Sequence, residues 1–129
     1  MYTSSGLALV PLPRCPNYCA SKAALHQFIM CLRRQLEGSS VKVIELFPPA
    51  VQTELHDAKH QPDIKDGRNI GMPIGEFMNT AWKGIVEGKE EIPVGFVIGA
   101  LEKIDGPRKA MASRLPWDPS EFDNIQQNA

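Results

Sequence analysis

The chain has 129 residues, enough for one domain with a single core. Hydrophobic residues make up 43% and charged residues 22%, and the formal net charge is -1, so no global field favours nucleic acid or an anionic membrane. No apolar run reaches the roughly 20 residues that span a bilayer, and the N-terminal segment lacks the basic flank of a signal peptide. These properties predict a cytoplasmic protein that binds neither nucleic acid nor membrane.

The cysteines give no clear site. Cys15, Cys19 and Cys31 are odd in number and follow no secretion signal, which argues against a disulfide framework. His26 lies near the first two, but a zinc site needs a fourth ligand and a tighter cysteine spacing, so no metal site is predicted. Cys19 and Cys31 are interpreted as small packing side chains on a helix.

The first half of the chain predicts a strand, a loop, a helix and a strand. Residues 1–10 are interpreted as the end of a strand entering a loop. A helix is predicted over Tyr18–Glu37, with Asn17 as its N-cap and Gly38 at its C-terminal end. Its apolar stripe is spaced i, i+3, i+4, i+7 and i+11, and consists of Leu25, Phe28, Ile29, Leu32 and Leu36. The β-branched stretch Val41–Phe47 then predicts a short, buried, parallel strand.

The second half predicts a polar loop and further helices. Residues 54–71 are interpreted as a long loop with one helical turn at its start. A helix is predicted over Met72–Glu87, with Pro73 in its first turn and an apolar stripe interpreted as core. That stripe consists of Ile74, Phe77, Met78, Ala81, Trp82, Ile85 and Val86.

The C-terminal region leaves two readings open. Residues 92–98 predict either a strand weakened by Pro93 or the lead into a helix. Gly106-Pro107 is expected to break any such helix, and a second short helix is expected over residues 108–114. We therefore predict one domain over residues 1–115, followed by a polar tail over residues 116–129.

Three residues carry the predicted chemistry. Tyr18 and Lys22 lie four apart at the start of a helix, so they project from the same face. A nearby ammonium stabilises a phenolate, and such a tyrosine can exchange a proton with a carbonyl or alcohol oxygen. Ser5, at the end of the preceding strand, can hydrogen-bond that same oxygen. His26 and His60 are interpreted as ordinary polar residues.

The surrounding motifs resemble one family. The sequence combines Ser4-Ser5-Gly6, the run YCASKAAL from Tyr18, a helix, and the run VKVIELFPPAVQT from Val41. From Ser4 to about His56 the chain resembles the short-chain dehydrogenase/reductase superfamily. The resemblance implies that Ser5, Tyr18 and Lys22 are catalytic, and that Tyr18 and Lys22 also contact a nicotinamide cofactor, with Lys22 on its ribose.

The segment Pro48–Thr53 matches the family's loop that closes over the nicotinamide. The resemblance implies that Val51 offers backbone groups to the carboxamide and that Thr53 approaches the pyrophosphate, so Pro48, Val51 and Thr53 join the cofactor-binding set. Pro49 stands where the family usually has glycine, which removes an N–H and restricts φ. The implied activity is NAD(P)-dependent hydride transfer between alcohol and carbonyl, with NADP favoured over NAD.

The rest of the family's plan is not found in the sequence. No strand followed by Gly-x-x-x-Gly-x-Gly and a helix occurs in it. We therefore expect the C-terminal, catalytic half of a doubly wound α/β fold: a partial Rossmann-like parallel sheet that lacks the N-terminal strands. The resemblance also implies a homodimer through the Tyr18–Glu37 helix. The alternative is a truncated, non-catalytic fragment or interaction module that has lost the dinucleotide-binding half.

Overall fold

A three-stranded parallel sheet forms the centre of the computed structural model, which describes residues 1–117. The strands are β1 (Tyr2–Thr3), β2 (Glu45–Phe47) and β3 (Glu91–Pro93), in the spatial order β1-β2-β3. In this register Glu45 pairs with Tyr2 on one side and with Glu91 on the other. Helical crossovers join the parallel strands, so the predicted α/β, partial Rossmann-like sheet is confirmed.

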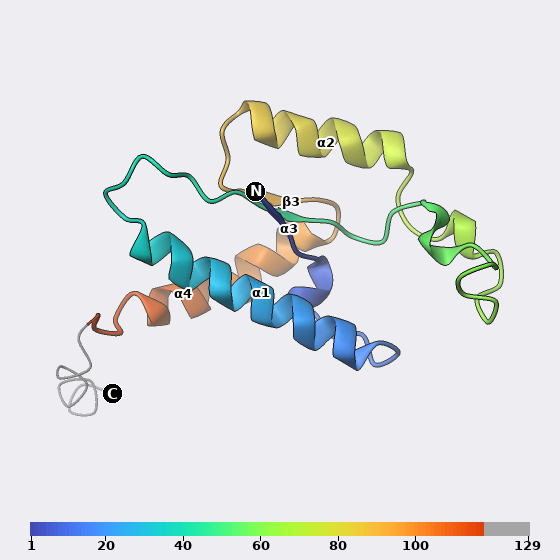
Figure 1. The fold of residues 1–129 in the computed structure, drawn as a ribbon, viewed down its shortest axis with the longest axis horizontal. Coiled ribbons are helices and arrows are strands. Elements are labelled where there is room, and N and C mark those ends of the chain that lie inside the picture. The colour runs from blue at the N-terminus through green and yellow to red at the C-terminus, as the bar shows by residue number, and fades with distance from the viewer. Residues whose placement is uncertain (118–129) are drawn as a thin grey trace.

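Helices cover both faces of the sheet. Helix α2 lies on one face, and α1, α3 and α4 lie on the other (Figure 1). Their bounds are α1 Pro16–Gln35, α2 Ile74–Val86, α3 Val97–Ala100 and α4 Gly106–Ala112. Three short 3-10 helices are η1 Gly6–Ala8, η2 Glu54–His56 and η3 Gly67–Asn69, and η4 Leu101–Asp105 is a π-helical turn. Within residues 1–117, no helix has the length and apolar character needed to cross a membrane.

Helix α1 begins two residues earlier than predicted. Pro16 is its first residue and Cys15 its cap, so the assignment of Asn17 as N-cap was wrong. Proline suits this position because the first helical N–H has no partner within the helix. Gly38, with φ of 80°, lies just beyond the helix end, as expected. Cys31 is exposed, so its interpretation as a packing residue was also wrong, whereas Cys19 is buried.

Two other elements are shorter or less buried than predicted. Only the last three residues of the predicted strand over 41–47 form β2, because neither neighbouring strand is longer than three residues. On α2, Ala81 is buried against β3, but four of the seven residues of the predicted core stripe face solvent. The exposed fractions are 54%, 51%, 62% and 69% for Ile74, Met78, Trp82 and Val86. A single short layer of strands covers only part of a broad apolar stripe.

The C-terminal region contains both predicted alternatives in succession. Strand β3 is followed by α3, η4 and α4 without the expected break at Gly106-Pro107. Pro107 lies in the first turn of α4, where the missing N–H costs nothing. Most of the predicted polar tail, residues 118–129, lies outside the described residues.

Candidate active site

Ser5 lies at the carboxyl end of β1. Its side chain is buried, and its Oγ accepts a hydrogen bond of 3.1 Å from the Leu7 N–H, which caps η1. The next N–H, that of Gly6, donates to the Pro48 carbonyl at 2.9 Å. This bond joins the loops that follow β1 and β2, at the edge where open parallel sheets bind ligands.

Gly6 is tightly enclosed. A Cβ added there would lie 2.6 Å from Val97 Cγ2 and 2.8 Å from Phe96 Cζ. Real Cβ atoms do not approach carbon atoms so closely, so only glycine allows α3 to pack onto this turn. The turn that carries Ser5 is therefore fixed from both sides, by the Pro48 carbonyl and by α3.

Tyr18 and Lys22 lie on successive turns of α1, as predicted. The Lys22 Nζ donates to the Thr3 carbonyl at 3.0 Å and lies 5.7 Å from the centroid of the Tyr18 ring. Tyr18 is 45% exposed, so its phenol is accessible from solvent. Because Thr3 is two residues before Ser5, the lysine connects α1 to the segment that carries the serine. The structure thus places Lys22 near the Tyr18 ring and bonds it to the segment that leads to Ser5.

The predicted cofactor loop has backbone groups free for a ligand. Val51 forms a parallel bridge with Met72, whose bonds run from the Met72 N–H to the Ala50 carbonyl and from the Gln52 N–H to the Met72 carbonyl, both 2.9 Å. No hydrogen bond within residues 1–117 uses the N–H or C=O of Val51 itself. One donor and one acceptor at adjacent positions fit a carboxamide, which carries both.

Thr53 and Gly71 complete the shape of this loop. The Thr53 Oγ1 accepts from the Leu55 N–H at 3.3 Å and caps η2, which leaves its own proton free to donate. Gly71 has φ of 92°, and a Cβ there would lie 2.2 Å from the Ala50 carbonyl oxygen. Sequence reasoning treated Gly71 only as part of a polar loop. Because residue 71 is a glycine, the segment that leads into α2 can pack closely against Ala50 in the predicted cofactor loop.

His26 was missed as a special residue. It is fully buried on α1, and its Nδ1 lies 3.0 Å from both carboxylate oxygens of Glu45, while its Nε2 lies 3.1 Å from Asp105 Oδ1. Burial alone lowers the pKa of His26, but the hydrogen bonds to Asp105 and Glu45 outweigh burial and raise it to about 9. Burial acts to raise the pKa of Asp105, yet bonds to His26 and Lys109 hold it well below its usual range. The sequence signal for this buried site was Glu45, a glutamate inside a mostly apolar predicted strand.

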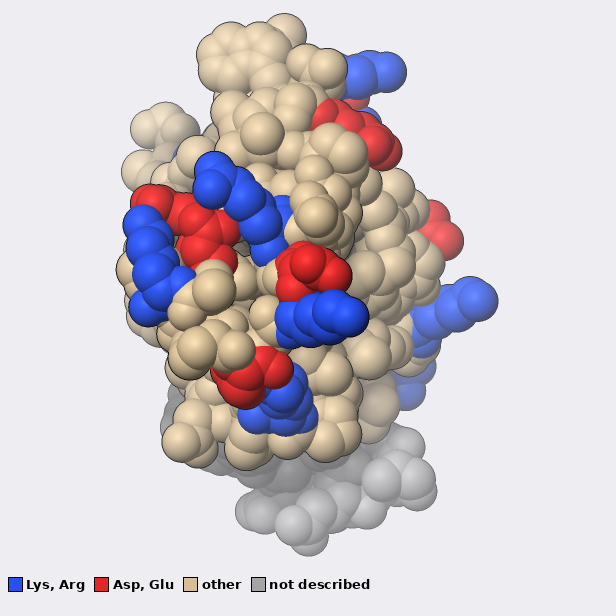
Figure 2. Space-filling view, turned by 90° about the vertical axis from the view of Figure 1, so that its right-hand side faces the viewer, with Lys and Arg blue, Asp and Glu red and all other residues tan. Residues whose placement is uncertain are grey.

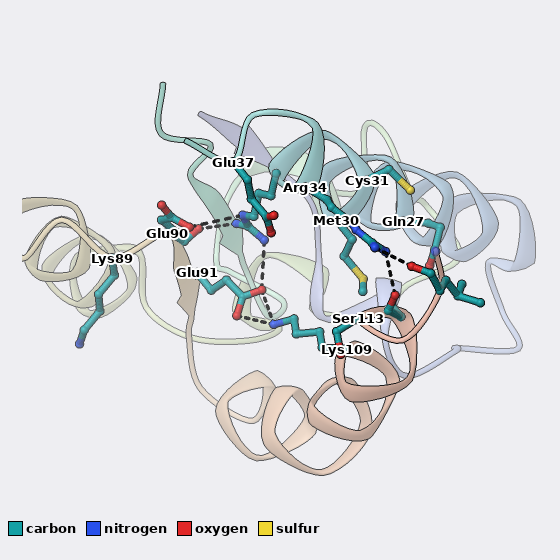
Figure 3. A pocket seen from close by; sticks show the side chains of 13 residues that line it. Gln27, Met30, Cys31, Arg34, Glu37, Lys89, Glu90, Glu91, Lys109 and Ser113 are labelled. Carbon is teal, nitrogen blue, oxygen red and sulfur yellow. Dashed lines mark hydrogen bonds and ion pairs between the residues drawn. The ribbon is translucent and has the colours of Figure 1, made fainter. Parts of the chain in front are cut away.

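A charged cleft of about 780 Å³ lies between α1 and α4, near this histidine (Figure 3). The arginine and lysine side chains that line it already bond to protein groups. Arg33 and Lys109 both bond to the Glu91 carboxylate, at 3.1 and 2.5 Å, and Arg34 donates to the carbonyls of Ala112 and Leu115. None of the predicted site residues lines the cleft.

The loop between β2 and α2 carries charges of both signs. Ion pairs join Lys59 to Glu54 at 2.9 Å and Arg68 to Asp57 at 3.3 Å. On the face of the molecule that includes this loop, basic and acidic side chains alternate without a continuous patch of one sign (Figure 2). Among the described residues, no three His, Cys, Asp or Glu side chains are grouped as metal ligands.

A family model and several curated proteins are similar to this chain. Residues 1–63 match the short chain dehydrogenase family model. The uncharacterized oxidoreductase DltE of Bacillus subtilis is 41% identical over 127 residues, which cover 97% of this chain and 46% of that protein. L-xylulose reductase of Caenorhabditis elegans is 37% identical over 75 residues, covering 57% of this chain and 30% of that protein.

A third relative is more distant. The 3-ketodihydrosphingosine reductase TSC10 of Yarrowia lipolytica is 26% identical over 121 residues, covering 88% of this chain and 32% of that protein. The chain thus spans less than half the length of these curated relatives. No solved structure matches it significantly. The family match, the oxidoreductase relatives and the parallel α/β sheet together support the assignment of this chain to the short-chain dehydrogenase/reductase superfamily.

Proposed function

We propose that the chain is the catalytic, C-terminal portion of an NAD(P)-dependent alcohol/carbonyl oxidoreductase. The observation that carries the proposal is the position of Lys22, which bonds to the carbonyl of Thr3, two residues before Ser5, and lies next to the Tyr18 ring. We propose that the buried hydroxyl of Ser5, the accessible phenol of Tyr18 and the ammonium of Lys22 act together at the carboxyl edge of the sheet.

The three side chains would divide the proton chemistry among them. In carbonyl reduction, the Tyr18 phenol gives its proton to the substrate oxygen, and in alcohol oxidation its phenolate takes that proton. The Ser5 hydroxyl accepts from Leu7, so its own proton can point to the same oxygen and orient it. The Lys22 ammonium has two donors left after its bond to Thr3, and it stabilises the phenolate by charge.

The cofactor loop fits a nicotinamide through groups on this chain. The unused N–H and C=O of Val51 would hold the carboxamide, the free proton of Thr53 would donate to a phosphate oxygen, and Pro48 would keep the loop against the Ser5 turn. When bound, the nicotinamide supplies or accepts the hydride. We propose that a glycine-rich segment outside these 129 residues supplies the remaining contacts, on a longer chain or on a partner.

A titration with NADPH and NADH tests whether these residues hold the cofactor. Nicotinamide fluorescence should report binding at millimolar concentration or below once the missing segment is supplied. Binding to the 129-residue chain alone would contradict the need for that segment. No binding in a completed protein would instead favour the alternative, a fragment without catalytic function.

Tyr18→Phe tests the proton-transfer role. Turnover of a carbonyl substrate should fall by about 100-fold or more, the range for loss of a general acid, with little change in cofactor affinity. Tyr2→Phe is the matched control, because Tyr2 is the only other tyrosine in the chain and lies on β1, before the Ser5 turn. A Tyr18→Phe variant that keeps full turnover would refute the assigned role.

A further inference from the structure

We propose that His26 is a positioning residue for this active site, clamped as an imidazolium between Glu45 and Asp105 so that α1 holds Lys22 and Tyr18 at the carboxyl edge of the sheet. The inference rests on the proposed function for its meaning in catalysis. Its structural content, that His26 sets the position of Lys22, can be tested without any cofactor or substrate.

The first step is the protonation state that the contacts require. Nδ1 faces the two carboxylate oxygens of Glu45, and Nε2 faces Asp105 Oδ1, all at 3.0 to 3.1 Å. A carboxylate only accepts hydrogen bonds, so each ring nitrogen must carry a proton. A neutral imidazole would leave a lone pair against an anion, with all three side chains fully buried.

The second step is the geometry of the helix. Tyr18, Lys22 and His26 are spaced at i, i+4 and i+8, so they lie along one face of α1. The clamp attaches this face to β2 through Glu45 and to the π-helical turn through Asp105. One turn from the clamp, Lys22 reaches the Thr3 carbonyl on β1. Rotation or sliding of α1 would break both contacts together.

The third step is the surrounding charge. Charged side chains from every element that packs here belong to one network, which the close-up of the cleft shows in part (Figure 3). Arg33 of α1 lies 3.7 Å from Glu45 and 3.1 Å from Glu91 of β3. Lys109 of α4 lies 3.0 Å from Asp105 Oδ2, and Arg108 of the same helix pairs with Asp105 Oδ1. These cations lie within ion-pair distance of the two carboxylates that hold His26, so the clamp is part of a wider network of opposite charges.

The direct test measures the exposure of Lys22 in the purified chain. The protein is acetylated with limiting N-hydroxysuccinimide acetate, and peptide mass spectrometry gives the labelling ratio of Lys22 to the exposed Lys42. His26→Gln should raise this ratio by about three- to tenfold, the factor that corresponds to the net free energy of one hydrogen bond. His60→Gln, at an exposed loop histidine, is the matched control and should leave the ratio unchanged.

The outcomes are distinct. A folded His26→Gln variant with an unchanged ratio overturns the inference. If that variant does not fold, Asp105→Asn, which retains the Glu45 pair, should raise the ratio by a smaller factor, and an unchanged ratio there also overturns it. If His26→Gln raises the labelling ratio but Tyr18→Phe keeps full turnover, His26 still positions Lys22. Only the proposed proton-transfer role of Tyr18 is then refuted.

A spectroscopic measurement examines the wild type directly. Nitrogen-15 NMR of labelled histidine should show two protonated ring nitrogens for His26 at pH 7. One unprotonated His26 nitrogen at pH 7 would overturn the clamp. The Lys22 to Lys42 labelling ratio should also increase as the pH rises through about 9, where His26 loses its proton.

Discussion

The two faces of the sheet are built from different chemistry. On the α2 face, Leu46 packs with Ala81, Ile92 and Val94, and every buried member of this cluster is apolar. On the α1 face, the adjacent Phe47 packs with Leu9 and Val97, but Glu45 points to His26 and brings buried charge into the core. Neighbouring strand residues point to opposite faces, so three consecutive positions of β2 create both environments.

The difference concerns how well each face fixes its helix. Apolar burial is non-directional, so it constrains the rotation of a helix less than a directional contact does. A buried ion pair tolerates little displacement, because an unpartnered charge is costly away from water. The helix that carries Tyr18 and Lys22 is the one fixed by charge, so the α1 face combines directional contacts with the proposed catalytic residues.

The largest expected effect is the loss of the buried glutamate. Glu45→Leu leaves one side of His26 without an anion, removes one of the anions near Arg33, and should lower the free energy of unfolding by about 3 to 5 kcal/mol. Urea denaturation followed by circular dichroism measures it. Glu54→Leu, at an exposed glutamate, is the control, and an equal loss in both variants would show that the buried pair has no special weight.

A cavity on the apolar face should cost somewhat less. Leu46→Ala removes a side chain that is 8% exposed and should lower the free energy of unfolding by about 3 kcal/mol. This loss should be the same at pH 6 and pH 10, because no titrating group lies in the cluster. By contrast, the loss in Glu45→Leu should shrink at pH 10, and identical pH behaviour in the two variants would erase the distinction between the faces.

The pH dependence of stability should come from the α1 face. The pKa of His26 is raised from 6.5 to about 9, so the folded state holds this proton more tightly than the unfolded state does. The resulting stabilisation is complete below pH 6.5 and is lost as the pH rises through about 9. Urea midpoints measured from pH 6 to pH 10 should fall over this window, and the decline should persist in His60→Gln but not in His26→Gln.

The smallest expected effect belongs to the surface loop. Lys59→Ala breaks an ion pair with Glu54 in which both side chains are more than half exposed. The free energy of unfolding should change by less than about 1 kcal/mol, because solvent screens such pairs. A loss comparable to that of Glu45→Leu would show that burial is not what distinguishes the two ion pairs.

Local patterns predicted much of the fold. The spacing of apolar residues gave both long helices to within two residues at each end, and the β-branched run located β2. The core assignment on α2 failed at Trp82 and Val86, since helical periodicity shows which side chains share a stripe but not how far the opposing sheet extends. The expected helix break at Pro107 does not occur, because a π-helical turn ends at Asp105 and Pro107 then lies in the first turn of α4.

By itself, the sequence determined the two long helices and the shared helix face of Tyr18 and Lys22, since residues four apart lie on one face of a helix. Only the tertiary structure decided that Lys22 reaches Thr3 and that His26 lies between Glu45 and Asp105, the second of which is 79 residues away. Such contacts depend on how separate elements pack together. No local pattern records which distant carboxylate a buried histidine will meet.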